Sequence, residues 1–178
     1  MGFHVEHRHT ITAPLPVENA FPLFTPAGEQ LWLEEWQPEF LYPDDGRTEA
    51  GMVFRTHHGG EETVWSCIEF APEQHRIRYV RVSSATRFVT LHIGCRRASA
   101  TSTSVEIRYA LTALTTEGTR MLKALTPTEF ASNIDRWQEK IACYAAGRPA
   151  NRPLLDKCGY VSVDTPCNAD AASVSPGA

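Results

Sequence analysis

Two histidines near the start of the chain have the residue type and spacing that acid–base chemistry needs. His7 and His9 lie two positions apart within residues 3–12, where residue character alternates. Alternate residues of a β-strand share a face, so both imidazoles lie with Val5 and Ile11. If that face is the inner one, either imidazole could act as a general acid or base near neutral pH, or the two could chelate a metal ion.

A purely structural role competes with catalysis for these two histidines. A histidine among apolar neighbours is usually satisfied by one backbone or hydroxyl partner. The metal interpretation is weaker, because no third ligand at a readable spacing accompanies the pair.

A second titratable group flanks the glycine pair at residues 59–60. Its members are His57, His58, Glu61 and Glu62. Two glycines between alternating stretches predict a hairpin turn, where exposed polar side chains are expected. We therefore predict a solvated hairpin tip at these four residues rather than a metal site.

The same alternation recurs in two later stretches. In residues 87–95 the more apolar set of side chains is expected to face inward, which places His92 in solvent. In residues 104–114 the apolar face carries Tyr109, whose inward hydroxyl needs a hydrogen-bond partner.

Large side chains are plentiful where a ligand cavity would form. Each of them fills a core as readily as it lines a pocket. Together they favour a flat or polycyclic apolar ligand over a charged one. The predicted ligand-binding residues are Trp32, Trp36, Phe54, Trp65, Tyr79, Tyr109, Phe130, Ile134 and Trp137.

Composition and missing motifs narrow the classes of function. The 178 residues carry a net charge of -4 with interspersed signs, which disfavours nucleic acid as a partner. No apolar run suits a membrane span and no signal peptide opens the chain, so a cytoplasmic protein is expected. Five cysteines without CxxC spacing indicate reduced thiols. The nucleophile and nucleotide motifs GxSxG, P-loop and GxGxxG do not occur, and we expect no cofactor.

The elements that must position these residues form one domain over residues 1–147. A strand over residues 3–12 precedes two short helices that begin near Pro16 and Pro26. About six further strands then follow with short connections, which predicts an antiparallel meander. Residues 148–178 are rich in Pro, Ala and Ser and are predicted to be a tail.

A long amphipathic helix over residues 117–146 ends the domain. Pro127 lies inside it, and an interior proline removes a helical hydrogen bond. Residues 126–129 (TPTE) also read as a capping box, with Thr126 as N-cap and Glu129 at the third position. We expect either a kink near Lys123 or a break at Thr126, with Ile134 and Trp137 facing the sheet.

This order of elements resembles the START-like or Bet v 1-like (SRPBCC) superfamily. Several short sequence motifs resemble its polyketide cyclase/dehydratase and lipid-transport branch: FTPAGEQLW (24–32), FLYP (40–43), GMVF (51–54), TVW (63–65) and YALTAL (109–114). The resemblance implies an α+β helix-grip fold, in which a curved antiparallel sheet of about seven strands surrounds the C-terminal helix. It also implies that the first and last strands are neighbours. On that basis we hypothesise that Tyr109 hydrogen-bonds to His7 or His9.

Three functions remain open from the sequence. The first is binding of a hydrophobic, aromatic or lipid-like small molecule in a cavity between sheet and helix. The second is a cofactor-independent cyclase or dehydratase, in which His7 or His9 takes a proton and Tyr109 or another hydroxyl stabilises the enolate. The third is a regulatory module that contacts a protein partner. Fold alone does not choose among them, and the oligomeric state is not indicated.

Overall fold

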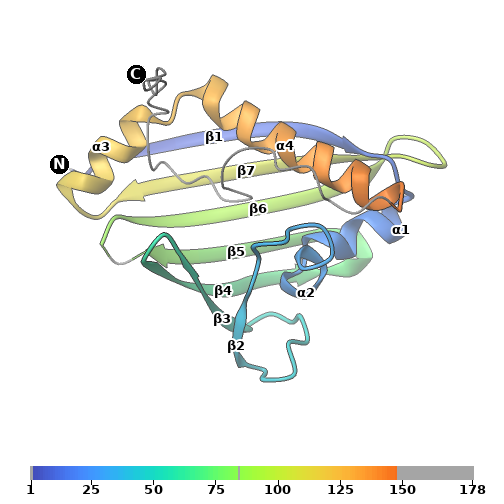
Figure 1. Cartoon of the computed structure of the whole chain (residues 1–178), viewed down its shortest axis with the longest axis horizontal. Coiled ribbons are helices and arrows are strands. Elements are labelled where there is room, and N and C mark those ends of the chain that lie inside the picture. Colours follow the sequence, from blue (N-terminus) through green and yellow to red (C-terminus); the bar gives the residue numbers. More distant parts are fainter. Residues whose placement is uncertain (1, 84, 148–178) are drawn as a thin grey trace, which may run out of the picture.

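An antiparallel sheet of seven strands curves around the last helix in this computed structural model, which describes residues 2–83 and 85–147 (Figure 1). The strands are β1 (His4–Ala13), β2 (Glu39–Tyr42), β3 (Val53–His58), β4 (Glu61–Ala71), β5 (Arg76–Ser83), β6 (Arg87–Arg97) and β7 (Thr103–Ala113). Their order in the sheet is β1-β7-β6-β5-β4-β3-β2. The predicted meander is therefore confirmed from β2 to β7, and β1 lies beside β7 as the resemblance implies.

Alternation along each strand separates an inner face from an outer face. In β7 the buried side chains are Thr103, Val105, Ile107, Tyr109 and Leu111. In β6 the predicted apolar set is buried, and Arg87 shares its face. Because alternate side chains of a strand lie on opposite faces of the sheet, this alternation decides which side chains reach the interior.

Three very short helical turns follow β1 and close one end of the interior. They are α1 (Val17–Ala20), the 3₁₀ turn η1 (Phe21–Phe24) and α2 (Pro26–Glu29). The Thr25 hydroxyl accepts a hydrogen bond from the Gly28 amide at 3.0 Å and so caps the start of α2. A Cβ at Gly28 would lie 1.9 Å from the Pro22 carbonyl oxygen, so only glycine fits this turn.

Indole and phenol groups from the core hold these short helices in place. The Trp32 Nε1–H donates to the Leu23 carbonyl at 2.8 Å, and the Trp36 Nε1–H donates to the Pro26 carbonyl at 2.7 Å. From β5, the Tyr79 hydroxyl donates to the Phe24 carbonyl at 3.2 Å. Helices this short are marginal on their own, and these bonds tie them to the body of the domain.

The C-terminal helical region is broken, as one of the two sequence predictions required. It consists of α3 (Thr116–Ala124) and α4 (Pro127–Ala145). The complete capping box is present: the Thr126 hydroxyl accepts from the Glu129 amide, and the Glu129 carboxylate accepts from the Thr126 amide. In Figure 1, α4 lies along β1 and β7, with α3 and α1 at opposite ends of the sheet.

The apolar stripe of α4 consists of Phe130, Ile134, Trp137 and Ile141, all buried. The predicted inward orientation of Ile134 and Trp137 is therefore confirmed. In the part of the chain that the structure describes, no helix is long and apolar enough to cross a membrane. Cys67, Cys95 and Cys143 are free thiols. The predicted tail over residues 148–178 lies outside the described residues.

Candidate functional site

Two of the three predicted catalytic residues, His7 and Tyr109, are buried between the sheet and α4, whereas His9 is half-buried. His7 on β1 and Tyr109 on β7 are directly opposite each other across the strand pair. Both contact Phe130 of α4: the His7 ring stacks on it with centroids 5.2 Å apart, and the Tyr109 ring meets it edge-on at 5.4 Å. One phenyl ring therefore contacts both polar rings.

The hypothesised hydrogen bond between Tyr109 and a histidine is not present. Among the residues that the structure describes, no hydrogen bond joins the Tyr109 hydroxyl to His7 or His9. The prediction was wrong because Phe130 packs against both rings, and because His9 bonds elsewhere: its Nε2 atom lies 2.7 Å from Asp135 Oδ1 on α4. The strand register places the His7 and Tyr109 rings opposite each other, but no hydrogen bond joins them.

His7 combines deep burial with an unused ring nitrogen. The residue is 7% exposed, and its Nε2 atom has no hydrogen-bond partner within the described chain. Burial lowers the pKa of His7 below its usual value, and a hydrogen bond with the Leu125 backbone opposes that shift. A neutral imidazole at this position keeps one nitrogen available to accept a proton.

His9 has a structural partner instead. Its bond to Asp135 joins the edge strand β1 to α4, and the Thr12 amide donates to the Gln138 side-chain carbonyl at 2.7 Å beside it. The two contacts lie one helical turn apart on α4. They hold the helix along β1, which makes His9 a poorer candidate than His7 for chemistry.

The predicted ligand-binding side chains are all buried. They are Trp32, Trp36, Phe54, Trp65, Tyr79, Tyr109, Phe130, Ile134 and Trp137. Many of the rings contact one another: Trp36 meets Trp65 edge-on at 5.7 Å, and Trp32 meets Trp137 at 5.9 Å. Phe54 and Trp65, opposite each other on β3 and β4, stack at 5.5 Å. This is a continuous aromatic interior.

A buried arginine lies among these rings. Arg81 on β5 is 1% exposed, and its guanidinium carbon lies 4.9 Å from the Trp65 ring centroid and 5.8 Å from that of Tyr109. Sequence reasoning missed it, although Arg81 alternates in phase with the buried Ile77 and Tyr79. Arginine is rarely buried unless it is paired or used.

Glu29 brings a carboxyl group to the same region from the end of α2. It is 8% exposed, and burial raises its pKa well above the usual value, an effect that the positive charge of Arg81 opposes. Burial likewise raises the pKa of Tyr109 to about 12, again against the influence of Arg81. We call Arg81, Glu29 and Tyr109 the interior polar group.

A second polar cluster lies where β4, β5 and β6 begin or end. Arg87 is buried and forms an ion pair with Glu61 at 3.3 Å, and the Thr86 hydroxyl donates to the same carboxylate at 2.7 Å. The Thr63 and Ser83 hydroxyls are 2.7 Å apart in the adjoining interior. The predicted hairpin tip therefore also anchors a buried cation through Glu61.

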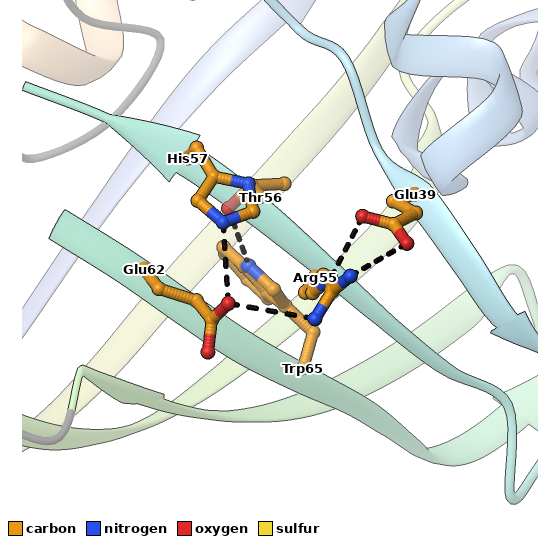
Figure 2. Close-up of polar contacts among 6 residues, drawn as sticks. All are labelled: Glu39, Arg55, Thr56, His57, Glu62 and Trp65. Carbon is orange, nitrogen blue, oxygen red and sulfur yellow. Dashed lines mark hydrogen bonds and ion pairs between the residues drawn. The ribbon is translucent and has the colours of Figure 1, made fainter. Parts of the chain in front are cut away.

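The rest of that hairpin forms an exposed ion-pair network (Figure 2). Arg55 donates to both oxygens of Glu39 at 2.7 Å and lies 3.6 Å from Glu62, which His57 approaches at 3.2 Å. Trp65 points the other way, and its Nε1–H donates to Thr56. No group of three metal-ligating side chains occurs among the described residues, here or elsewhere.

Known proteins resemble this chain in structure at low sequence identity. No protein-family model matches the sequence, and no curated protein sequence is significantly similar to it. Norcoclaurine synthase from Thalictrum flavum, solved in complex with dopamine and hydroxybenzaldehyde, is 10% identical with a TM-score of 0.61, over 83% of this chain and 90% of that chain. Ara h 8.0201 is 13% identical with a TM-score of 0.54, over 83% and 97% of the respective chains.

A third structure of the same shape is DynU16, from the dynemicin biosynthetic locus. It is 14% identical with a TM-score of 0.55, and the match covers 83% of this chain but 49% of that one. At such identities the likeness shows the fold alone, so the polyketide cyclase/dehydratase and lipid-transport branch stays a prediction. The sheet order, the short helices and the C-terminal helix give this chain the helix-grip fold of the START-like or Bet v 1-like superfamily.

Proposed function

We propose that this protein binds a flat, hydrophobic small molecule that carries an acidic group, in the interior between the sheet and α4. The apolar part of the ligand lies against Phe130 and Trp137 of α4, and its acidic group lies toward Arg81. Ligand sites are typically apolar with a few convergent polar groups, and the interior polar group supplies these.

The position of Arg81 is the observation that carries this proposal. Its guanidinium is fully buried and lies over the face of Trp65. Ionised groups lose much of their hydration when they are buried, so an anionic ligand group would gain more from this guanidinium than from an exposed one. The aromatic rings around it present flat surfaces to the rest of the ligand.

The structural comparison lends support without identifying the ligand. Norcoclaurine synthase was solved with two aromatic small molecules, dopamine and hydroxybenzaldehyde. The acidic group in our proposal rests on Arg81 and not on that relative.

Two fluorescent probes of nearly equal shape test the proposal. Anilinonaphthalene sulfonate is an aromatic anion, and phenylnaphthylamine is its uncharged counterpart. Both are expected to bind the wild-type protein with enhanced fluorescence. Arg81→Met keeps the volume of the side chain and removes its charge, so it should weaken sulfonate binding by about ten-fold and leave the neutral probe nearly unaffected.

A matched substitution separates site-specific loss from a change in overall charge. Arg97 is exposed at the end of β6 and forms an ion pair with Glu18. Arg97→Met should leave the affinity for both probes unchanged. Failure of the wild-type protein to bind either probe would contradict the proposal, as would an equal loss of both probes in Arg81→Met.

A second candidate function is a cofactor-independent enzyme of the polyketide cyclase/dehydratase type, and His7 favours it. Its buried Nε2 atom has no hydrogen-bond partner within the described chain, and a lowered pKa leaves the imidazole unprotonated at neutral pH. Such a nitrogen suits a general base. It would take a proton from a carbon next to a carbonyl group. The C–H electron pair would become a C=C bond, and the π pair of the carbonyl group would move onto its oxygen to give an enolate.

Isotope exchange tests this second function without knowledge of the natural substrate. A β-diketone incubated with the protein in heavy water should exchange its acidic C–H for C–D faster than in buffer. His7→Gln should abolish the acceleration, and His9→Gln should preserve most of it. Equal rates with and without the protein would remove the support for catalysis and leave the binding proposal intact.

A further inference from the structure

The outer face of the sheet carries a row of basic side chains. Arg8 on β1 is directly opposite Arg108 on β7, and Arg108 is directly opposite His92 on β6. His92 in turn is opposite Arg78 on β5. Like charges directly opposite each other destabilise a sheet, so the pairing of Arg8 with Arg108 is one that folding alone disfavours.

This basic row (Arg8, Arg108, His92 and Arg78) borders a depression of about 620 Å³. Small side chains lie in the adjacent row, where Ala110 is opposite Thr90. Long side chains beside short ones leave a hollow on the sheet. The volume falls in the range of small-molecule sites and is small for a protein segment.

Positive charge exceeds negative charge around the depression. Four arginines line it, Arg76 being the fourth, against Glu6 and Glu69. Glu69 is shared between Arg76 at 3.2 Å and Arg78 at 3.4 Å, and Arg108 is paired with Glu106 at 2.7 Å. The chain as a whole has a net charge of -4, so this excess is local.

We propose that this depression is a binding site for a small molecule that carries a polyphosphate group. Four adjacent strands place the row over three strand spacings, about 14 Å, which is more than one phosphate group spans. One guanidinium group can donate to two phosphate oxygens at once, and Arg8 and Arg108 place two such groups on adjacent strands. The basic row lies on the outer face of the sheet, while His7 and Tyr109 of the interior also line the depression. The proposal rests on the basic row and not on the ligand proposed for the interior.

Inorganic tripolyphosphate is the probe for this site, with isothermal titration calorimetry as the measurement. Wild-type protein should bind it, and Arg8→Gln or Arg78→Gln should each weaken the affinity by about five-fold or more. Arg47→Gln is the matched control, since Arg47 is exposed and paired with Glu49 away from the sheet face. It should have no effect, and neither should Arg81→Met.

Thermal unfolding of Arg8→Gln and the binding of a second polyanion, citrate, test the same proposal. Arg8→Gln removes one of two opposed positive charges, so its thermal unfolding temperature should equal or exceed that of the wild type. Citrate, a polyanion without phosphate, should bind more weakly than tripolyphosphate. Equal or tighter binding of citrate would overturn the assignment to phosphate, and equal loss in Arg8→Gln and Arg47→Gln would overturn the site.

His92 provides an independent signal at the centre of the row. Burial, Arg108 and Arg78 lower its pKa, while Glu69 and Glu106 oppose that shift. Bound phosphate adds negative charge beside the ring, so tripolyphosphate should raise the pKa of His92 in an NMR titration. An unchanged His92 titration at saturating tripolyphosphate would contradict binding at this place.

Discussion

His7 and Tyr109 lie directly opposite each other on β1 and β7, and the phenyl ring of Phe130 contacts both of them. Phe130 of α4 thus packs against both polar rings, and the two rings do not hydrogen-bond to each other. The His7 Nε2 atom stays without a hydrogen bond from the described chain, and the Tyr109 ring faces the Arg81 guanidinium. The helix and the sheet together create the polar interior.

Substitution of Phe130 should change the titration of His7. Burial lowers the pKa of His7, so its neutral form is favoured in the folded protein. Phe130→Leu admits more water to the imidazole, and the pKa should rise toward the ordinary value. NMR titration of the ring protons measures this, and Ile141→Val, further along the same buried stripe, should leave the His7 pKa unchanged. A lower His7 pKa in Phe130→Leu would contradict the role given to burial.

Glu29 should make the protein less stable at alkaline pH. Burial raises its pKa, so the folded protein holds the carboxyl proton more tightly than the unfolded chain does. The stability from the protonated carboxyl is fully present below the unfolded pKa and is lost as pH rises through the folded pKa. Glu29→Gln stays neutral, so at pH 8 it should gain on the order of 1 kcal/mol in free energy of unfolding.

Urea unfolding at two pH values tests this. The gain from Glu29→Gln should disappear below about pH 4, where the wild-type carboxyl is protonated in both the folded and the unfolded protein. Glu35→Gln is the control, because Glu35 is exposed in the same region. A gain of the same size at both pH values would show that ionisation is not its cause.

The contact between His9 and Asp135 should hold α4 against β1. Asp135→Ala removes the carboxylate that lies 2.7 Å from His9 Nε2. Both side chains are partly exposed, so the cost in global stability should be at most about 1 kcal/mol. Amide hydrogen exchange should speed up in the middle of α4, and Arg136→Ala, an exposed neighbour, should not reproduce this. Unchanged protection of α4 in Asp135→Ala would remove the role of the contact.

The capping box at the start of α4 should contribute a measurable part of its stability. Thr126→Ala removes the hydroxyl that accepts from the Glu129 amide, at an expected cost of about 1 kcal/mol. Thr128→Ala changes an exposed threonine two residues later and should cost much less. Equal losses in the two variants, measured by urea unfolding, would show that the cap is not the source of the effect.

Local sequence patterns predicted the inner faces of the strands and the interruption of the C-terminal helix. Alternation assigned Tyr109 to the inner face, and the TPTE motif offered a break at Thr126 as one of two alternatives. These predictions succeed because strand period and helix capping are properties of a few consecutive residues.

The polar interior could be predicted only in part. Arg81 alternates in phase with Tyr79, so its inward position was available from the strand period, but its charge suggested the opposite face. Glu29 is different, because its burial depends on how three short helical turns dock on the sheet. The basic row combines residues from four strands, and only the register between strands brings them together.

Location of a bound probe by NMR tests the central claim most directly. With anilinonaphthalene sulfonate at saturation, we predict intermolecular nuclear Overhauser effects from its rings to the indole Nε1–H of Trp65 and to the ring of Tyr109, which flank Arg81. The same effects should be weaker in Arg81→Met at equal probe concentration. Effects confined to side chains of the outer face, such as Thr90 and Ala110, would contradict an interior site.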